Sequence, residues 1–179
     1  NVTLTTPSRN ALATPPSIRP ASIVISLAAT TANRTNYPVR ALKVTALVDV
    51  ETLYITDIHS TTSKKHDAKI GPQVARRNAG DLRSLAADRG YDAKAFRNEL
   101  RENGIRPLIK HRIMNPLDHA HNARMDGDRY HQRSMSETVF SSIKRTLGAA
   151  VRARSWWLEF REMLLKATVY NLRRSVRFP

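Results

Sequence analysis

The sequence predicts one α/β domain in which helices flank a mixed sheet, and an antiparallel three-strand meander opens that sheet. Three strand-like segments follow one another in the first third of the chain, helix-like and strand-like segments then alternate, and helix-like segments end it. A length of 179 residues suits a single domain with a substantial core. We expect this domain over residues 22–179. Residues 1–21 hold four prolines among Thr, Ser and Arg, which is typical of a disordered tail.

The expected meander depends on three segments rich in β-branched residues. Residues 23–27 form an almost continuous apolar run, which is typical of a short buried strand. Residues 42–50 alternate between small apolar and polar side chains and predict a second strand, and residues 52–59 predict a third. The short link at residues 49–51 indicates a hairpin, so we expect the first three strands to be antiparallel.

Helices and strands are expected to alternate after residue 67. Ile70 and Val74 have the spacing of a helix that Gly80 ends. A mostly apolar segment then leads into Asp88, so we expect a strand that delivers this acid at its carboxyl end. The predicted elements are a helix over 67–79, a strand over 82–87, a helix over 93–102 and a strand over 106–110.

Residues 111–129 have no clean period and contain Pro116 and Gly127, which predicts a loop. His119 and His121 within it have the spacing of a metal-binding pair. No third ligand accompanies them, so contact with solvent or phosphate is the favoured interpretation.

Residues 130–144 predict a continuous helix with two faces. Four polar residues fall within an arc of roughly 60° on such a helix: Tyr130, Arg133, Glu137 and Lys144. A neighbouring apolar arc, expected in the core, holds Met135, Val139, Ile143 and Leu147. The polar arc suits phosphate chemistry, because a carboxylate can hold a divalent metal while Arg and Lys hold phosphate oxygens. Ser134-x-x-Glu137 also matches a capping box, in which the Glu only satisfies backbone donors.

A last helix is expected over residues 155–176. Its apolar stripe, expected to face the core, holds Leu158, Leu165, Val169, Leu172 and Val176. Its exposed side is basic and holds Arg161, Lys166, Arg173 and Arg174.

Composition points to a polyanionic partner. Thirty Lys and Arg against fifteen Asp and Glu leave a net charge of +15, and nucleic acid is the first choice of partner. The chain has no cysteine, which excludes a disulfide framework and a thiolate zinc site. Its apolar runs are too short to span a bilayer, so we expect no membrane association. With nucleic acid as the expected partner, we expect a cytoplasmic, nucleoid-associated protein.

The spacing Tyr-x2-Arg-x3-Glu-x6-Lys, met by Tyr130, Arg133, Glu137 and Lys144, is similar to the signature of a large group of prokaryotic insertion-sequence DDE transposases. The stretch from Ala87 to Asp92 also resembles the second-aspartate motif of that family, and Asp88 precedes Glu137 by 49 positions. The resemblance covers residues 34 to 177.

This resemblance implies an RNase H-like fold and a function. Asp88 and Glu137 correspond to the second and third catalytic acids, which bind Mg²⁺ or Mn²⁺ in the family. Tyr130, Arg133 and Lys144 correspond to residues that hold DNA. The implied activity is metal-dependent cleavage and strand transfer of DNA at insertion-sequence ends, with transposon ends and target DNA as partners and a homodimer as a possible assembly.

The first aspartate of the family pattern is missing. Thr30 stands where that acid is expected, and the chain has no Asp or Glu before Asp49. Asp49 is the nearest substitute, although it resembles a non-catalytic position of the family. Together with the absence of an initiating Met, this predicts a transposase that is truncated or degenerate at its amino end and inactive alone. The alternatives are a non-catalytic basic DNA-binding protein that keeps the fold, and an RNA-binding protein of ribosomal type.

Overall fold

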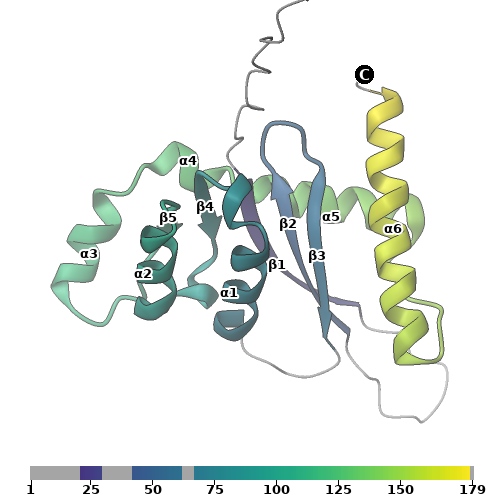
Figure 1. Ribbon diagram of the computed structural model, residues 1–179, viewed down its shortest axis with the longest axis horizontal. Helices are drawn as coiled ribbons and strands as arrows, with labels where there is room; N and C mark the ends of the chain where they lie inside the picture. The colour runs from purple at the N-terminus through teal and green to yellow at the C-terminus, as the bar shows by residue number, and fades with distance from the viewer. Residues whose placement is uncertain (1–20, 30–41, 62–66, 178–179) are drawn as a thin grey trace, which may run out of the picture.

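A five-stranded mixed sheet forms the centre of the protein (Figure 1). The structure is a computed structural model and describes residues 21–29, 42–61 and 67–177. The strand order is β3-β2-β1-β4-β5. The strands are β1 (Ala21–Ala29), β2 (Leu42–Asp49), β3 (Ile55–Thr61), β4 (Ser84–Ala87) and β5 (Arg106–Ile109). The predicted tail over residues 1–21 lies almost wholly outside the described ranges.

The sheet combines antiparallel and parallel pairs. β2 lies between β1 and β3 and is antiparallel to both, whereas β4 is parallel to β1 and to β5. The mixed sheet and its five predicted strands are therefore confirmed. β3 begins later than residue 52 because the preceding turn is longer than expected. Asp49 N donates to Tyr54 O at 2.9 Å, and Leu53 adopts a left-handed φ of 57° inside this turn.

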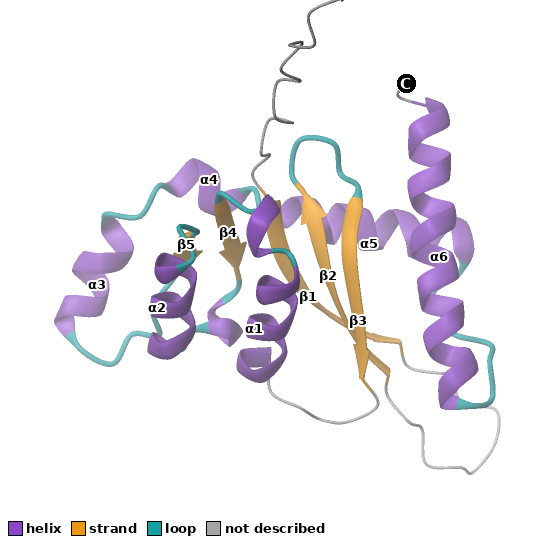
Figure 2. Cartoon of the chain, viewed as in Figure 1, coloured by secondary structure: helices purple, strands orange, loops and turns teal. Residues whose placement is uncertain are grey.

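The described ranges hold six α-helices; α5 passes behind the strands in Figure 2, and α3 lies at the far left, beyond α2. They are α1 (Asp67–Arg77), α2 (Lys94–Glu102), α3 (Pro116–Ala123), α4 (Gly127–His131), α5 (Ser134–Leu147) and α6 (Trp156–Arg177). None of these helices combines the length and the hydropathy that a membrane crossing requires.

The core consists of two clusters, one on each face of the sheet. β2 contributes to both because its side chains alternate: Leu47 enters one cluster, and Val44, Ala46 and Val48 enter the other. The first cluster packs under α1 and α2 around Ile70, Val74, Leu85, Tyr91, Phe96 and Leu100. The second packs under α5 and α6 around Val139, Phe140, Ile143, Met163, Ala167 and Tyr170. The buried face of α5 packs against the sheet, and this packing fixes the position of the helix.

Gly71 marks the closest approach within the first cluster. It is a buried residue of α1. A Cβ at this position would lie 2.6 Å from Cδ1 of Tyr91, whose side chain is fully buried. A hydrogen is therefore the only side chain that this contact accepts without movement of the aromatic ring.

The predicted loop over 111–129 is wrong, since α3 and α4 occupy most of it. The Asn115 side chain accepts a hydrogen bond from Asp118 N at 3.1 Å, and the Asp118 carboxylate accepts one from Asn115 N at 3.0 Å. These two bonds form a capping box, and Pro116 fills the first helical position, where its missing N–H costs nothing. Asp126 caps α4 through Arg129 N. Pro116 thus begins a helix.

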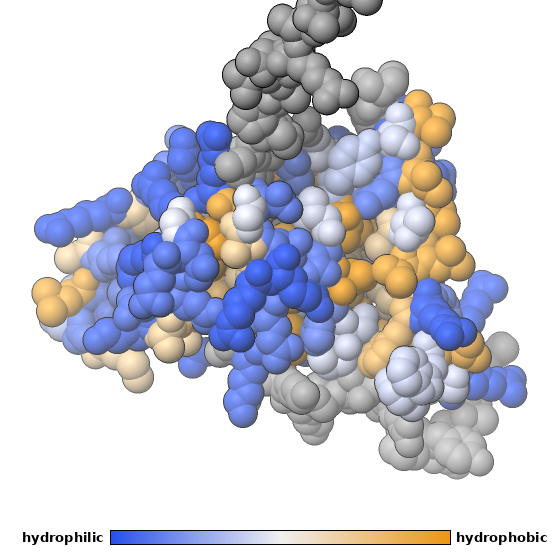
Figure 3. Space-filling view, in the orientation of Figure 1, coloured by the Kyte–Doolittle hydropathy of each residue, from blue (hydrophilic) through white to orange (hydrophobic). Residues whose placement is uncertain are grey.

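The predicted buried stripe of α6 is also wrong. Four of its members are mostly exposed: Leu158 (51%), Leu165 (63%), Leu172 (60%) and Val176 (82%). The buried face consists of Met163, Ala167 and Tyr170. Figure 3 shows apolar surface along α6, at the right of the molecule.

Polar contacts explain why α6 is rotated in this way. Lys166 Nζ donates to Gly148 O at 3.2 Å and to Ala150 O at 2.8 Å, so this lysine, expected on the exposed side, is bound to the link before α6. The Asn171 amide donates to Ile55 O at 2.8 Å and accepts from Ile55 N at 3.0 Å. These contacts turn the leucines outward, because they bind α6 to the link and to β3.

Candidate active site

The expected continuous helix over 130–144 is interrupted. α4 ends at His131 and α5 begins at Ser134. Gln132 and Arg133 keep near-helical dihedrals, but Arg133 N donates to Tyr130 O, three residues back, at 3.2 Å. Such bonds tighten the backbone relative to an α-helix. Tyr130 therefore lies on a different helix from Glu137 and Lys144.

Arg133 lies between the two predicted catalytic acids. Its Nη1 is 4.0 Å from Asp88 Oδ1 and 3.8 Å from Glu137 Oε1, so the two carboxylate oxygens are no farther apart than these two distances laid end to end. Asp88 directly follows β4, and Glu137 lies in the first turn of α5. Both side chains are open to solvent, at 60% and 68% exposure. The fold thus brings together two accessible carboxylates that are far apart in sequence.

The capping-box interpretation of Glu137 is wrong. The residue at the cap of α5 is Arg133, and it makes no side-chain cap hydrogen bond. The Ser134 hydroxyl instead donates to His131 O at 2.9 Å. The carboxylate of Glu137 is therefore not used to satisfy the first turn of its helix.

Tyr130 is buried, at 4% exposure, and orients two cations. Lys110 Nζ lies 4.5 Å from the centre of its ring, and Arg133 Cζ lies 5.1 Å from the same centre. Both distances fit cation–π contacts. Tyr130 positions these side chains from within the fold. Sequence reasoning missed Lys110. Its only sequence signal is its position directly after β5, the strand that lies next to β4, and β4 leads into Asp88.

The remaining predicted site residues lie elsewhere. Lys144 is exposed on α5, seven residues and about 10 Å along the helix axis from Glu137. Asp49 is only 6% exposed, and its Oδ1 accepts hydrogen bonds from Glu51 N at 2.9 Å and Thr52 N at 3.4 Å. Its strand is separated from β4 by β1. Asp49 thus stabilises a turn and does not join the acid pair.

His119 and His121 do not converge on a metal. The His121 ring stacks on His111 with centres 3.8 Å apart, and His111 Nδ1 lies 3.1 Å from Asp118 Oδ1. No cluster of three or more His, Cys, Asp or Glu side chains suited to a metal occurs in the described part of the chain.

The stacked histidines predict a loss of stability in acid. The pKa of His121 lies below its ordinary value of 6.5 because burial desolvates the ring and because His111, Arg97 and Arg101 face it; Asp118 acts in the opposite direction. As pH falls, His121 is therefore protonated in the unfolded chain before it is protonated in the folded chain. The neutral His121 ring contributes fully to the stability of the fold above its ordinary pKa of 6.5. This contribution is lost as pH falls through 6.5 toward the lower pKa of the folded state. Urea unfolding at a series of pH values should show a weaker acid-side decline for His121→Gln. Exposed His119 supplies the control variant, His119→Gln, and an unchanged slope in both would contradict this account.

A groove of about 530 Å³ lies between α5 and the carboxyl-terminal half of α6. Glu137 lines it, together with one whole face of α5. The candidate metal ligand Glu137 therefore faces a surface that can hold an extended ligand.

Comparisons with known proteins found similar solved structures and one matching family model. The fold is similar to that of a piggyBac transposase chain, solved by cryo-EM in a synaptic complex with hairpin DNA, with a TM-score of 0.53 and 9% identity over 86% of this chain and 46% of that chain. A chain of the simian T-cell lymphotropic virus intasome in complex with the PP2A regulatory subunit B56 gamma gives a TM-score of 0.44 and 10% identity over 82% of this chain and 48% of that chain. The chain spans less than half the length of either solved chain.

A search of curated protein sequences found no match. The family model described as "Transposase DDE domain" matches residues 22–172. This match covers most of the chain, and it includes both acids and the helix that carries Glu137. The chain therefore belongs to the transposase family defined by the DDE domain.

Proposed function

We propose that residues 22–179 form an RNase H-like transposase domain, opened by a three-strand meander, of the kind that carries out metal-dependent DNA strand cleavage and strand transfer at insertion-sequence ends. Without the first acid, this chain binds the DNA and a metal ion but cleaves poorly on its own. The observation that carries the proposal is the approach of Asp88 and Glu137 to one guanidinium. Two exposed carboxylates from a strand end and a neighbouring helix are what a phosphoryl-transfer site needs to hold a divalent ion.

Asp88 and Glu137 would hold Mg²⁺ or Mn²⁺. Their oxygen atoms are the ligand type that these cations prefer, and a cationic group, the Arg133 guanidinium, already lies between them. Arg133 Nε is buried and has no hydrogen-bond partner among the described residues, so the guanidinium is not fixed by a full set of bonds. A bound ion would supply charge stabilisation at the reacting phosphate.

The basic residues would hold DNA. Arg133 can turn from the carboxylates to a phosphate as a bidentate donor. Tyr130 holds both Arg133 and Lys110 over its ring. Lys144 would contact a phosphate farther along α5. Transposon ends and target DNA are the proposed partners, and the cytoplasmic nucleoid is the proposed location.

Metal-coupled DNA binding tests this function. A carboxylate near a phosphate repels it until a cation neutralises the acid, so Mg²⁺ should tighten DNA binding by the unmodified chain. Glu137→Gln should bind DNA about two- to tenfold more tightly without metal and lose most of the Mg²⁺ response, since each 1.4 kcal/mol is a factor of about ten. Fluorescence anisotropy with and without Mg²⁺ measures both effects.

The matched control is Glu102→Gln, which removes an exposed acid from α2. It should keep the full Mg²⁺ response. The same loss in both variants would mean that Glu137 holds no metal.

A second candidate function, DNA binding without catalysis, is favoured by the missing first acid. It would show as equal DNA affinity with and without Mg²⁺ in the unmodified chain.

We further propose a homodimer formed through the exposed face of α6. Leu158, Leu165 and Leu172 are seven residues apart and all point outward, which is the spacing of a helix that packs along a second helix. α6 has 22 residues and is about 33 Å long, so two copies can pack over a long seam. Leu165→Glu should shift the chain to a monomer in analytical ultracentrifugation. Gln73→Glu, on the exposed surface of α1, should leave the dimer intact. An unmodified chain that is monomeric at all concentrations would refute the proposal.

A further inference from the structure

Four guanidinium groups line the groove between α5 and α6. Arg145 comes from α5, and Arg173, Arg174 and Arg177 come from the last turns of α6. Arg174 Nε donates to Thr52 O, so this residue also stabilises the turn after β2. The other three side chains are exposed, and no carboxylate in the described part of the chain forms an ion pair with them. Arg145, Arg173 and Arg177 thus bring three positive charges to the groove that form no ion pair with a carboxylate of the described residues.

Hydroxyl groups form the rest of the polar lining. They follow one face of α5 from its first turn to its last: Ser134, Thr138, Ser141, Ser142 and Thr146. Ser134, Thr138 and Thr146 donate their hydroxyl hydrogens to backbone carbonyls of α4 and α5, which leaves Ser141 and Ser142 as the hydroxyl donors that face the groove. Hydroxyls and guanidinium groups are donors that proteins direct at phosphate oxygens. Glu137 is the one acid among the residues that line the groove. The groove therefore has the chemistry of a phosphate-binding channel, with a candidate metal ligand in its wall.

The dimensions suit a run of phosphates. Ser134 and Thr146 are separated by about 18 Å along the axis of α5, and one DNA strand carries a phosphate about every 3.4 Å of helix axis, so about five phosphates fit beside the helix. Crowded arginines repel one another, and a polyanion removes that repulsion. A single phosphate or a nucleotide would leave most of the channel unfilled.

We propose that the α5–α6 groove binds the phosphodiester backbone of one DNA strand and leads it to the acid pair of Asp88 and Glu137. The choice of DNA rests on the function proposed above. Arg145, Arg173 and Arg177 hold phosphates as charged donors, Ser141 and Ser142 add neutral ones, and the strand reaches Glu137 at the first turn of α5. This surface is separate from Lys110, Tyr130 and Lys144, none of which lines the groove.

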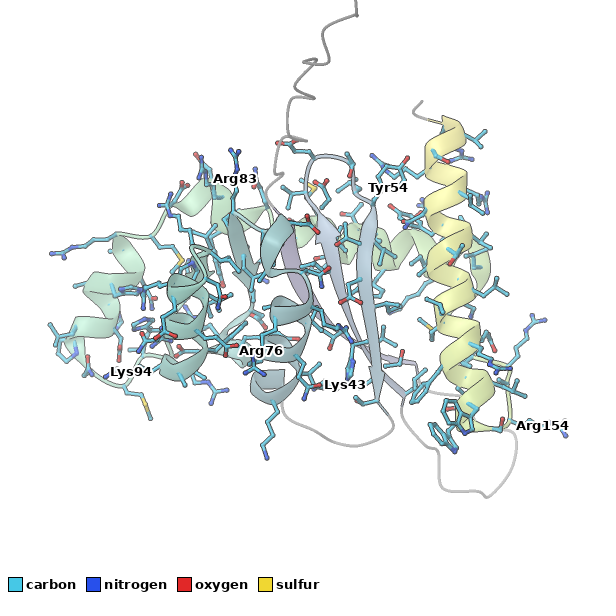
Figure 4. The ribbon with its side chains drawn as sticks, in the orientation of Figure 1. Lys43, Tyr54, Arg76, Arg83, Lys94 and Arg154 are labelled. Carbon is cyan, nitrogen blue, oxygen red and sulfur yellow. The ribbon has the colours of Figure 1, made fainter. Side chains whose placement is uncertain are left out.

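A charge-matched pair of triple variants tests the groove. In the groove variant, Arg145, Arg173 and Arg177 are each replaced by Gln. In the control variant, the exposed residues Arg83, Arg106 and Arg154 are replaced by Gln, and all three lie outside the groove lining. Figure 4 labels Arg83 and Arg154 at separate places on the surface. Both variants lose the same net charge, so any difference between them reports position.

The readout is binding of a labelled duplex oligonucleotide without metal at several salt concentrations. The groove variant should lose about two to three units of the log–log salt slope, because each phosphate contact contributes about 0.9. It should also bind at least about tenfold more weakly at low salt than the control variant. Equal losses in the two variants would overturn the groove and leave the proposed function standing. A flat salt dependence in the unmodified chain would overturn both.

A bulky uncharged substitution that obstructs the groove provides a second test, because it leaves the net charge unchanged. Ser141→Trp places a large ring in the channel from an exposed helix position, and Gln73→Trp adds the same ring to exposed α1. DNA binding should weaken in Ser141→Trp only, with thermal unfolding confirming that both variants are folded. Normal DNA affinity in Ser141→Trp would show that the strand does not pass through the groove.

Discussion

The Val24→Asp variant is expected to bind Mn²⁺ at least about tenfold more tightly than the unmodified chain and to gain metal-dependent DNA cleavage, which the unmodified chain should perform poorly. The pairs Ala21↔Leu85 and Ser22↔Ala86, continued along the two parallel strands, place position 24 beside Asp88. Position 24 also pairs with Ala46, which belongs to the cluster under α5. Neighbouring strands are about 4.8 Å apart, so an acid introduced here would join Asp88 and Glu137.

The size of the effect follows from electrostatics and geometry. One added charge pair at 4 Å is worth about 4 kcal/mol near a protein surface, far more than the 1.4 kcal/mol that a tenfold change needs. A site with reacting groups misplaced by about 1 Å loses roughly a hundredfold in rate, so a missing ligand leaves little cleavage. Asp49 does not replace it, because its carboxylate is bound to the backbone of a turn.

Titration calorimetry with MnCl₂ and nicking of a supercoiled plasmid measure the two gains. Val24→Asn is the control, since it has the same shape without the charge. Equal Mn²⁺ affinity in the Asp and Asn variants would show that position 24 is not beside the acid pair. Thr30, the position expected for the first acid, lies outside the described residues.

Gly71→Ala should destabilise the fold by about 1–3 kcal/mol, the usual cost of overpacking a core. Its new Cβ would lie 2.6 Å from Cδ1 and 2.9 Å from Cε1 of Tyr91. Tyr91 cannot move aside easily, because its side chain is fully buried in the cluster with Phe96. The turn that holds Tyr91 directly follows Asp88, so a shift of the ring also disturbs the acid pair.

Gly80→Ala is the matched control. A Cβ at Gly80 meets nothing within 4 Å, so this variant should change stability by no more than about 0.5 kcal/mol. Chemical denaturation of both variants gives the comparison. Equal free energies of unfolding would mean that α1 and Tyr91 can separate without cost.

The strands were predictable because local and tertiary preferences agree in them. The alternation in β2 reflects two buried faces of different character, and the apolar approach to Asp88 reflects a strand buried along its whole length. The helix α3 was missed because Pro116 is a helix breaker in most positions and a good first residue in one. Only the Asn115 and Asp118 pair distinguishes the two cases.

The features that the sequence could not predict depend on side-chain contacts between segments that are far apart in the chain. The rotation of α6 depends on hydrogen bonds that Lys166 and Asn171 make to backbone far away in sequence. Asp88 and Glu137 were predicted as a pair through a motif, since nothing in their spacing shows that one guanidinium lies between them. Lys110 was missed because its contact with Tyr130 exists only after β5 and α4 pack together.

The Asn171 contact also covers part of an edge of the sheet. β3 is an edge strand, and an edge with free N–H and C=O groups is a template on which another chain can add a strand. The Asn171 amide occupies both backbone groups of Ile55, as a neighbouring strand would. α6 thus closes the start of this edge, and loss of that one amide would expose a hydrogen-bonding pair on β3 to other copies of the chain.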